Sequence, residues 1–433
     1  MKEIVFFATF LFSFGSVASD SVSETLKTKV EVYAKDLFAA YQDLHTNPEL
    51  SFKEAKTSEK IAQNLKTLGY EVTKEVGKTG VVGVLKNGKG PTLLIRTDMD
   101  ALPVEENTGF KFSSQNKGVM HACGHDIHMT VFLGTARFLA EEKSRWKGTL
   151  VMMAQPAEEL GAGALAMLKD GLFKKFPTPT KALALHVNSS MESGRVGFRS
   201  GFSMANVDSL DIEVKGVGGH GAYPHKTKDP IVLASQMVMG FQTLISRETS
   251  PLDSGVVTVG VFQAGTKSNI IPDSAMLKLT IRSYKDEVRE KLVTGVKRIA
   301  MGMAEAAGIP NDRKPTFRDS ENYTPAVYND PTLTNEAMAS VRKILGDDNV
   351  QEIDPVMGGE DFGQLGRQSP KIPIVMFFIG AVPKNMMKEF KKKNMPLPSL
   401  HSSTFTPDWE LTIKTGIKAM AMAAVDQLVP KDQ

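Results

Sequence analysis

Residues 93–100 read Leu-Leu-Ile-Arg-Thr-Asp-Met-Asp, an apolar run that ends in two acids. Comparable apolar runs recur along the chain and alternate with segments whose apolar residues have helical spacing. The runs lie at 80–85, 150–155, 182–185 and 372–379, and helical segments lie at 23–44 and 53–68. Strands this apolar are typical of sheets buried on both faces. We therefore expect an α/β fold in which helices flank a mixed, mostly parallel sheet.

A different pattern occupies residues 198–323. Strands are expected at 208–215, 256–263, 275–283 and 314–318, and helices at 229–247 and 286–307. The order β-α-β-β-α-β is that of a ferredoxin-like unit. Because the buried-strand pattern resumes afterwards, we expect this unit to be inserted into a larger domain made of residues 20–197 and 324–433.

Composition narrows the class of protein. The chain has 433 residues, of which 41% are hydrophobic, and this is ample for two or three packed domains. Its net charge of +3 gives no reason to expect a nucleic-acid partner. The single cysteine, Cys123, cannot form an intramolecular disulfide, so it is packing, a reactive thiol or a metal ligand.

Residues 1–19 have the layout of a signal peptide, with Lys2, an apolar run at 4–14 and small residues at 16–19. The apolar run is shorter than the ~20 residues of a membrane-spanning helix. We expect an exported protein, periplasmic or secreted, with no membrane anchor after cleavage. A hydrophobic first helix is the alternative. The basic segment 384–393 is expected to be a solvated loop or helix face.

Polar side chains follow the predicted strands at the points where they end. Asp98 and Asp100 follow 93–97, Glu158 and Glu159 follow 150–155, His186 follows 183–185, and His401 follows 372–379 after a loop. Open α/β sheets bind their ligands at this edge. Residues 121–128 read His-Ala-Cys-Gly-His-Asp-Ile-His, and an extended segment would place Cys123 and His125 on one side.

A thiolate, imidazoles and a carboxylate together suit a divalent transition metal and argue against magnesium or calcium. Of two adjacent acids, one can bind metal while the other moves protons. Each feature alone has a plainer explanation: helix capping for Asp98 and Asp100, a solvated helix start for the paired glutamates, and core packing for Cys123. Their joint placement at successive strand ends favours a metal site.

Six segments carry a family resemblance. They are Arg96-Thr-Asp-Met-Asp-Ala-Leu-Pro103, Met120-His-Ala-Cys-Gly-His-Asp126, Gln155-Pro-Ala-Glu-Glu159, Gly218-Gly-His-Gly-Ala-Tyr-Pro-His225, Gly359-Glu-Asp-Phe362 and Leu400-His-Ser402. In this order they resemble the M20 metallopeptidase/amidohydrolase family. The most similar branch holds hippurate hydrolase, N-acyl-amino-acid amidohydrolases and indole-acetyl-amino-acid hydrolases.

The resemblance implies specific roles. A pair of divalent ions (zinc, manganese, cobalt or nickel) would be bound by Cys123, His125, Glu159, His186 and His401. Glu158 would be the general base, Asp100 would orient the site, and His220 would reach a partner subunit's site to stabilise the oxyanion. Asn269 and Arg282 would hold a substrate α-carboxylate. His121, His128, His225 and Asp98 are expected near the site, and His45 is expected to be structural.

The function that follows is a homodimeric, two-metal amidohydrolase of N-acyl amino acids, with the inserted unit as its lid and dimerisation domain. Two alternatives stay open: a dipeptidase or carboxypeptidase of the same family, and a catalytically inactive module that binds metal or solute.

Overall fold

The computed structural model describes residues 14–319 and 323–429. Eight strands form one mixed sheet in the order β1-β2-β4-β3-β5-β16-β6-β15. Their bounds are β1 Glu71–Val76, β2 Gly80–Asn87, β3 Thr92–Asp98, β4 Gly148–Gln155, β5 Lys181–Glu192, β6 Val196–Phe198, β15 Val350–Glu352 and β16 Ile374–Val382. The central pairs β4–β3, β3–β5 and β5–β16 are parallel. The predicted α/β fold with a mixed sheet is confirmed.

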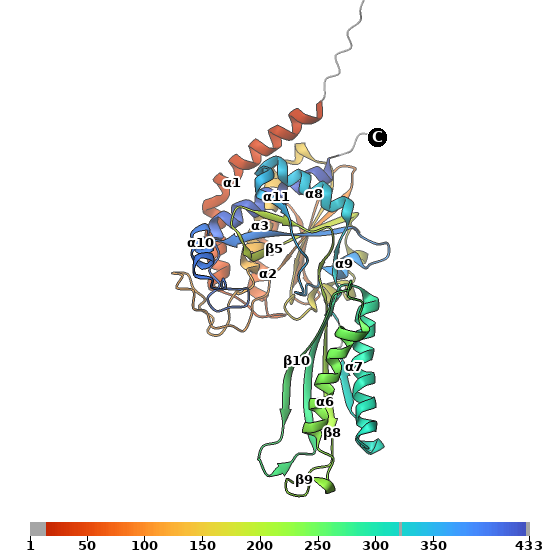
Figure 1. The fold of residues 1–433 in the computed structure, drawn as a ribbon. Coiled ribbons are helices and arrows are strands. Elements are labelled where there is room, and N and C mark those ends of the chain that lie inside the picture. Colours follow the sequence, from red (N-terminus) through yellow and green to blue (C-terminus); the bar gives the residue numbers. More distant parts are fainter. Residues whose placement is uncertain (1–13, 320–322, 430–433) are drawn as a thin grey trace, which may run out of the picture.

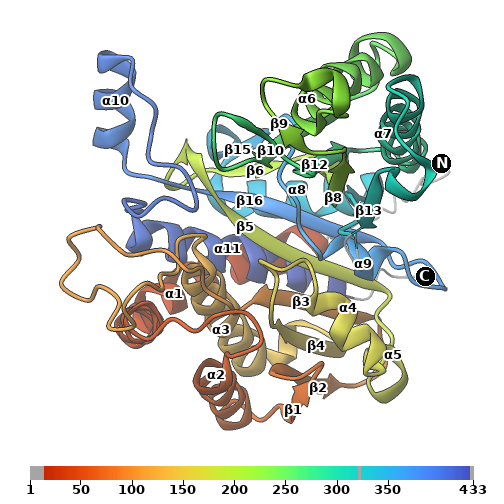
Figure 2. The same ribbon diagram turned by 90° about the horizontal axis from the view of Figure 1, so that it is seen from below.

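Helices cover both faces of this sheet, and Figure 2 shows the two sets on opposite sides. One face carries α1 Phe14–Thr46, α2 Ala55–Thr67, α3 His125–Glu141, α8 Pro331–Leu345 and α11 Trp409–Leu428. The other carries the shorter α4 Gly163–Lys169, α5 Leu172–Lys175 and α9 Gly363–Gly366. Helices α3 and α11 approach closely because Gly134 lies against Ile417, where a Cβ atom would come within 2.5 Å of the isoleucine side chain.

A second sheet lies in an arm that extends away from the body of the molecule (Figure 1). Its four antiparallel strands have the order β10-β12-β8-β13. The elements are β8 Asn206–Lys215, α6 Pro230–Thr243, β10 Gly255–Ala264, β12 Ser274–Ser283, α7 Asp286–Ala306 and β13 Thr316–Asp319. Leu210, Phe241, Leu277 and Leu292 belong to a core of its own. We call this the inserted unit and the remainder the main body.

All six predicted elements of the inserted unit are present in the predicted order. The helix expected at 229–247 changes at its end into a π-helical turn, Leu244–Glu248. Phe198, the predicted first residue of this unit, instead ends strand β6 of the main sheet. Residues 201–204 form strand β7 (Gly201–Met204), which pairs with β14 (Val327–Asn329). At the far end of the arm, β9 (Gly219–His220) pairs with β11 (Ile270–Ile271).

The first residues of the chain are only partly described. Residues 1–13 of the predicted signal peptide lie outside the described residues, and helix α1 begins at Phe14. In the described part of the chain, no helix combines the length and the hydropathy that a membrane crossing requires.

Candidate metal centre

The five predicted ligands form one continuous group. The Nε2 atoms of His401 and His186 lie 3.3 and 3.5 Å from the Cys123 Sγ atom. The Glu159 Oε1 atom lies 3.5 Å from His401 Nε2 and 3.8 Å from His125 Nε2. The ligating atoms of Cys123, His125 and His186 all lie within 4.8 Å of one another. Side chains separated by as many as 278 residues thus meet at one point.

Two local expectations about these ligands are wrong. Cys123 and His125 are not in an extended segment, because Gly124 has a φ of +79° and His125 is the first residue of α3. Only glycine fits there, since a Cβ atom would come within 2.6 Å of the Val187 side chain. His186 does not end its strand, because β5 continues to Glu192. The tight turn and the strand nevertheless bring all three ligands together.

Backbone carbonyl groups orient two of the histidines. The Nδ1–H groups of His125 and His186 donate to the carbonyl oxygens of Asp100 and Val187, each at 2.8 Å. A carbonyl oxygen only accepts, so the proton is on Nδ1 and each Nε2 faces the cluster. This is the arrangement in which a neighbouring group fixes a metal-binding histidine.

Two buried atoms of this cluster lie within ion-pair distance of each other, at 3.8 Å, but have no hydrogen-bond partner in the described part of the chain. His125 Nε2 and Glu159 Oε1 are buried and make no hydrogen bond within the described residues. Burial lowers the pKa of His125, but Asp98, Asp100 and Glu159 outweigh it and raise this pKa to about 10. Carboxylates thus surround two buried atoms that make no hydrogen bond. A site of this kind favours the binding of a cation. The sulfur, nitrogen and oxygen donors therefore fit transition-metal ions.

Asp100 holds the turn that carries the two glutamates. Its Oδ1 accepts from the Glu158 N–H at 3.0 Å, and its Oδ2 accepts from the Glu159 N–H at 3.1 Å and from the Ser51 hydroxyl at 2.6 Å. Burial raises the pKa of Asp100, but contacts with His125 and Ser51 outweigh it and lower this pKa. Asp100 thus acts on the site through the backbone of its neighbours.

The same turn contains a strained residue. Ala157 has a φ of +48°, which is uncommon outside glycine. Its N–H donates to Glu54 Oε1 at 2.9 Å, and Glu54 is fully buried. Strain of this kind persists where the surroundings hold it, and it clusters at functional sites. Glu54 was not foreseen as part of this support.

Behind Glu158 lies a buried charge network that sequence reasoning missed. Arg96 donates to Asp98 at 2.7 Å, to Glu360 at 2.8 Å and to Asp361 at 3.3 Å. Burial and then the nearby Glu360 raise the pKa of Glu158 well above its ordinary value. An arginine inside an apolar strand was the available signal, because a buried charge needs a partner.

Of the three histidines expected to neighbour the site, two are buried and one is exposed. The Val187 N–H donates to His128 Nε2 at 2.9 Å, and His128 Nδ1–H donates to Asp98 at 2.7 Å, so both ring nitrogens are already engaged. His121 is buried beside the cluster, and burial lowers its pKa to about 4. His225, in contrast, is exposed near the far end of the inserted unit, so the expectation that it borders the site is wrong within one chain.

His45 lies in a buried cluster of its own. Its Nδ1 lies 2.6 Å from Asp126 Oδ2 and its Nε2 lies 3.1 Å from Glu106 Oε1. Burial lowers its pKa, but hydrogen bonds to both acids outweigh this and raise the pKa to about 9. These bonds tie the end of α1 to the first turn of α3, which is a structural role.

A cavity of about 320 Å³ opens onto the cluster. Cys123, Glu158, Glu159, His186 and His401 line it from the main body, and Val207, Ser209 and Arg282 line it from the inserted unit. The Arg282 Nε–H donates to Thr280 Oγ1 at 3.0 Å, and Nη1–H donates to the Met357 carbonyl oxygen at 3.3 Å. It makes no ion pair with any residue that the structure describes, so its guanidinium is available to an anion.

His220 and Asn269 lie elsewhere. Both are exposed in the β9–β11 region at the far end of the arm, where the Gly221 N–H donates to the Asn269 carbonyl oxygen at 2.8 Å. Neither lines the cavity that holds Arg282. The structure thus brings Arg282, but not Asn269 of the same chain, to the cavity, and their joint role in holding a carboxylate stays a prediction.

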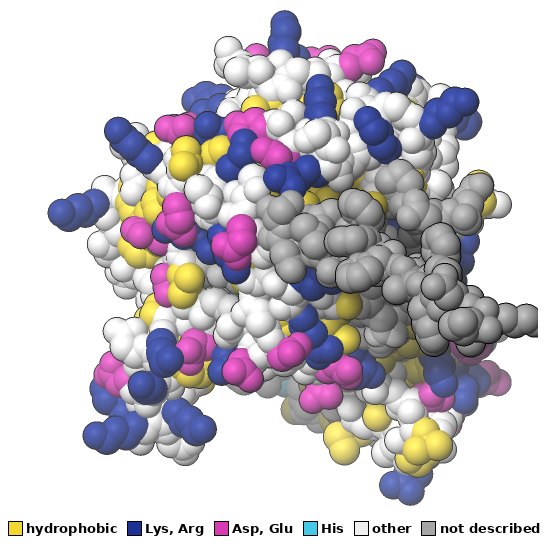
Figure 3. Space-filling model, turned by 90° about the horizontal axis from the view of Figure 1, so that it is seen from above, with side chains coloured by type: hydrophobic (Ala, Val, Ile, Leu, Met, Phe, Trp, Pro, Cys, Tyr) yellow, Lys and Arg dark blue, Asp and Glu magenta, His cyan; other side chains and the backbone are white. Residues whose placement is uncertain are grey.

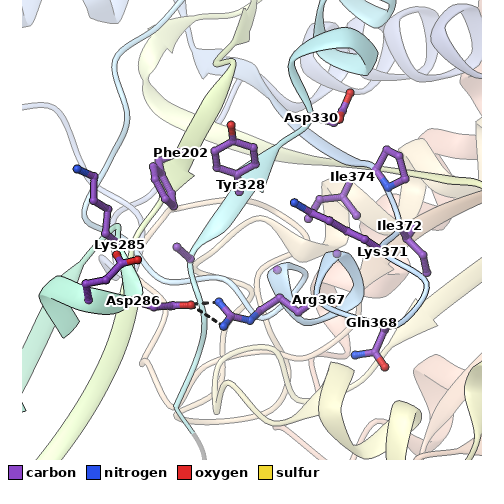
Figure 4. A pocket seen from close by; sticks show the side chains of 15 residues that line it. Phe202, Lys285, Asp286, Tyr328, Asp330, Arg367, Gln368, Lys371, Ile372 and Ile374 are labelled. Carbon is purple, nitrogen blue, oxygen red and sulfur yellow. Dashed lines mark hydrogen bonds and ion pairs between the residues drawn. The ribbon is translucent and has the colours of Figure 1, made fainter. Parts of the chain in front are cut away.

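A larger cavity, of about 760 Å³, lies where α7 meets the main body (Figure 4). Phe202, Tyr328 and Lys371 line it, and the Asp286–Arg367 ion pair of 2.6 Å crosses its wall. None of the five candidate ligands borders it. The smaller cavity is therefore the candidate site.

Comparison with known proteins places this geometry in a family. Residues 94–401 match Peptidase family M20/M25/M40. Thermostable carboxypeptidase 1 of Saccharolobus solfataricus is 38% identical over 93% of this chain and 98% of its own. Hippurate hydrolase of Campylobacter jejuni is 40% identical over 74% of this chain and 82% of its own.

A solved structure agrees with these relatives. The YXEP protein of Bacillus subtilis, a dinuclear metal-binding peptidase of family M20, matches with a TM-score of 0.74 and 31% identity over 92% of this chain and 99% of that one. The chain belongs to peptidase family M20/M25/M40 and is a metal-dependent hydrolase.

Proposed function

We propose that this enzyme hydrolyses the amide bond of N-acyl amino acids, either hippurate-like or acetylated. One observation carries the proposal: four of the five candidate ligands line one cavity together with the separate acid Glu158 and with Arg282, which has no ion pair among the described residues. The fifth ligand, His125, belongs to the same cluster as Cys123 and His186. A cavity of about 320 Å³ suits a small substrate. The similarity to a hippurate hydrolase supports the same class of substrate.

Two divalent ions are the proposed cofactors, and zinc, manganese, cobalt and nickel all suit the donors. The two ions would be held by the five candidate ligands Cys123, His125, Glu159, His186 and His401. When bound, such ions lower the pKa of water and polarise a carbonyl group. The similarity to a dinuclear metal-binding peptidase supports the number of ions.

The side chains of this chain then have distinct tasks. The Glu158 carboxylate accepts a proton from the attacking water and passes it to the nitrogen of the departing amine. Its raised pKa brings it closer to the working pH of such a shuttle. Asp100 keeps Glu158 in place through the backbone. Arg282 pairs with the α-carboxylate and so fixes the direction of the substrate.

We assign His220 and Asn269 to the site of a partner subunit in a homodimer. Both side chains are exposed at the tip of the inserted unit. Neither lines the cavity of its own chain, so neither would contact a substrate bound there. A histidine N–H directed at the developing oxyanion would stabilise the transition state. The proposal that residues 1–19 are a signal peptide is separate and is tested by sequencing the N-terminus of the exported protein.

A carboxypeptidase is the second candidate. Its support is the 38% identity to a thermostable carboxypeptidase together with Arg282, which would hold the C-terminal carboxylate of a peptide equally well. Turnover of acetylated and benzoylated amino acids, measured beside N-blocked dipeptides, separates the two. Faster cleavage of the dipeptides would assign the carboxypeptidase activity.

The decisive variant is Glu158→Gln, which keeps the side-chain shape and removes the base. We expect wild-type metal content and a loss of turnover of about 100- to 10,000-fold. Glu410→Gln, an exposed glutamate at the start of α11, is the matched control and should retain full activity. An active Glu158→Gln enzyme would contradict the assigned base. A wild-type protein that binds metal but releases no amino acid would indicate the inactive binding module.

A further inference from the structure

Helix α10 (Lys384–Lys393) stands apart from the rest of the main body. It lies beyond the end of β16 and projects sideways in Figure 2. Figure 3 shows Lys and Arg side chains gathered on the projection at the lower left, which is the place of α10. None of its residues is buried. The helix is thus a surface feature that neither the core nor the metal centre explains.

The lysines of α10 share one face. Lys384, Lys388, Lys391 and Lys392 occupy positions i, i+4, i+7 and i+8, and all four are exposed. Residues with this spacing line one side of a helix. Met386 and Phe390, four residues apart, lie half-buried on another side of the helix. Met386 also lines a small hollow with Leu397 and Phe405, so this side rests on the protein while the lysine face is turned outward.

This face concentrates positive charge. The ten residues of α10 contain five lysines and one glutamate, a net charge of 5 − 1 = +4, whereas the whole chain has +3. Lys393 pairs with Glu389 at 2.5 Å, and Lys384 lies 3.6 Å from Glu192. Lys388, Lys391 and Lys392 make no ion pair with any described residue. Three free cations on one exposed face form a field that a polyanionic surface complements.

The residues next to the lysine face of α10 favour a lipid surface over a nucleic acid as its partner. Met395, the second residue after the helix, is 53% exposed. The lysine face has no aromatic side chain on which a base would stack, because Phe390 lies on the other side. A lysine cluster next to an exposed apolar residue suits the headgroup region of an anionic bilayer. We propose that α10 docks this enzyme on an anionic membrane surface.

Docking through α10 leaves the metal centre intact. The segment from α10 leads to His401, whose N–H donates to the Ala122 carbonyl oxygen at 2.9 Å. That bond fixes the ligand independently of the helix. Variants of the lysine face are therefore expected to keep wild-type turnover of a soluble substrate, and this shows that they are folded.

The test is co-sedimentation of the holoenzyme with vesicles of phosphatidylcholine, with and without about one third phosphatidylglycerol, at low and high salt. The variant reverses Lys388, Lys391 and Lys392 to glutamate. The control reverses Lys56, Lys66 and Lys89, three exposed lysines away from α10 without a described ion pair. Since each lysine near an anionic surface strengthens binding about fivefold, the α10 variant should bind at least about 100-fold more weakly, and the control should change little.

Binding of the wild type should require the anionic lipid and weaken at high salt. Equal losses in the two triple variants would overturn the proposal, because the effect would then reflect net charge alone. Absence of wild-type binding to the anionic vesicles would also overturn it. Tighter binding to single-stranded DNA than to these vesicles, lost in the α10 variant, would assign the face to nucleic acid instead.

Discussion

The main body and the inserted unit organise their functional residues in opposite ways. In the main body, Cys123, His125 and Glu158 are almost fully buried, and neighbouring backbone groups and acids orient them. In the inserted unit, His220 and Asn269 are exposed at the end of an arm, and Arg282 is the one of these three candidate residues that lines the cavity. The body therefore holds a preassembled cluster, whereas His220 and Asn269 of the arm lie apart from that cluster within the same chain.

Loss of a metal ligand should have the largest effect. Cys123→Ala removes the central sulfur, and we expect turnover to fall at least about 1000-fold because water loses its activating cations. Metal content, measured by elemental analysis, should fall with it. Ser402→Ala, in the loop of His401, is the control and should keep both. A Cys123→Ala enzyme with full metal and activity would break the idea of a preassembled centre.

His220→Ala tests the arm and should lower turnover about 100- to 1000-fold with unchanged metal content. His225→Ala, an exposed histidine in the same region, is the matched control and should be close to wild type. Mixing His220→Ala subunits with Glu158→Gln subunits should restore activity, because one site of the mixed dimer then has both groups. A mixture that stays inactive would contradict a site shared between subunits.

Arg282→Ala should lower kcat/KM about 10- to 100-fold for substrates with a free α-carboxylate. A loss of this size is typical when a charge-assisted hydrogen bond is removed. The kcat/KM for the matching α-amides should change little. Lys278→Ala, an exposed cation on the same strand, controls for charge. Equal losses with acids and amides would show that Arg282 has a structural role.

The buried His45 cluster predicts a smaller effect, on stability. Its folded pKa of about 9 exceeds the ordinary 6.5, so its stabilisation is complete below pH 6.5 and is lost as the pH rises through 9. The shift corresponds to about 3 kcal/mol of unfolding free energy. Urea unfolding at pH 6 and pH 9.5 should show this loss in the wild type and not in His45→Gln. If the unfolding free energy changed equally between pH 6 and pH 9.5 in the wild type and in His45→Gln, the result would contradict a charged His45 paired with its two acids.

The sequence predicts the parts of this molecule that periodicity and apolarity define. Runs such as 93–97 mark the central strands because these strands are buried on both faces. Strand β1 was missed because its residues Glu71–Val76 are mostly polar and exposed, and β6 and β15 are too short to show a period. The polar residues of the second half of β5 concealed its length.

The candidate site divides in the same way. Its ligands were predictable because each one follows a recognisable strand or motif. The Arg96–Glu360 pair was not, because it joins residues 264 positions apart and no local spacing reports such a contact. The separation of Asn269 from Arg282 depends on the length of the arm, which is a property of the folded unit.

The most direct test of the central idea is crystallography of the zinc-reconstituted enzyme at the zinc absorption edge. The account predicts two anomalous peaks per chain in the cavity bounded by Cys123, His186 and His401. An active enzyme whose map has no peak among these side chains, or whose ions lie elsewhere in the molecule, would contradict it.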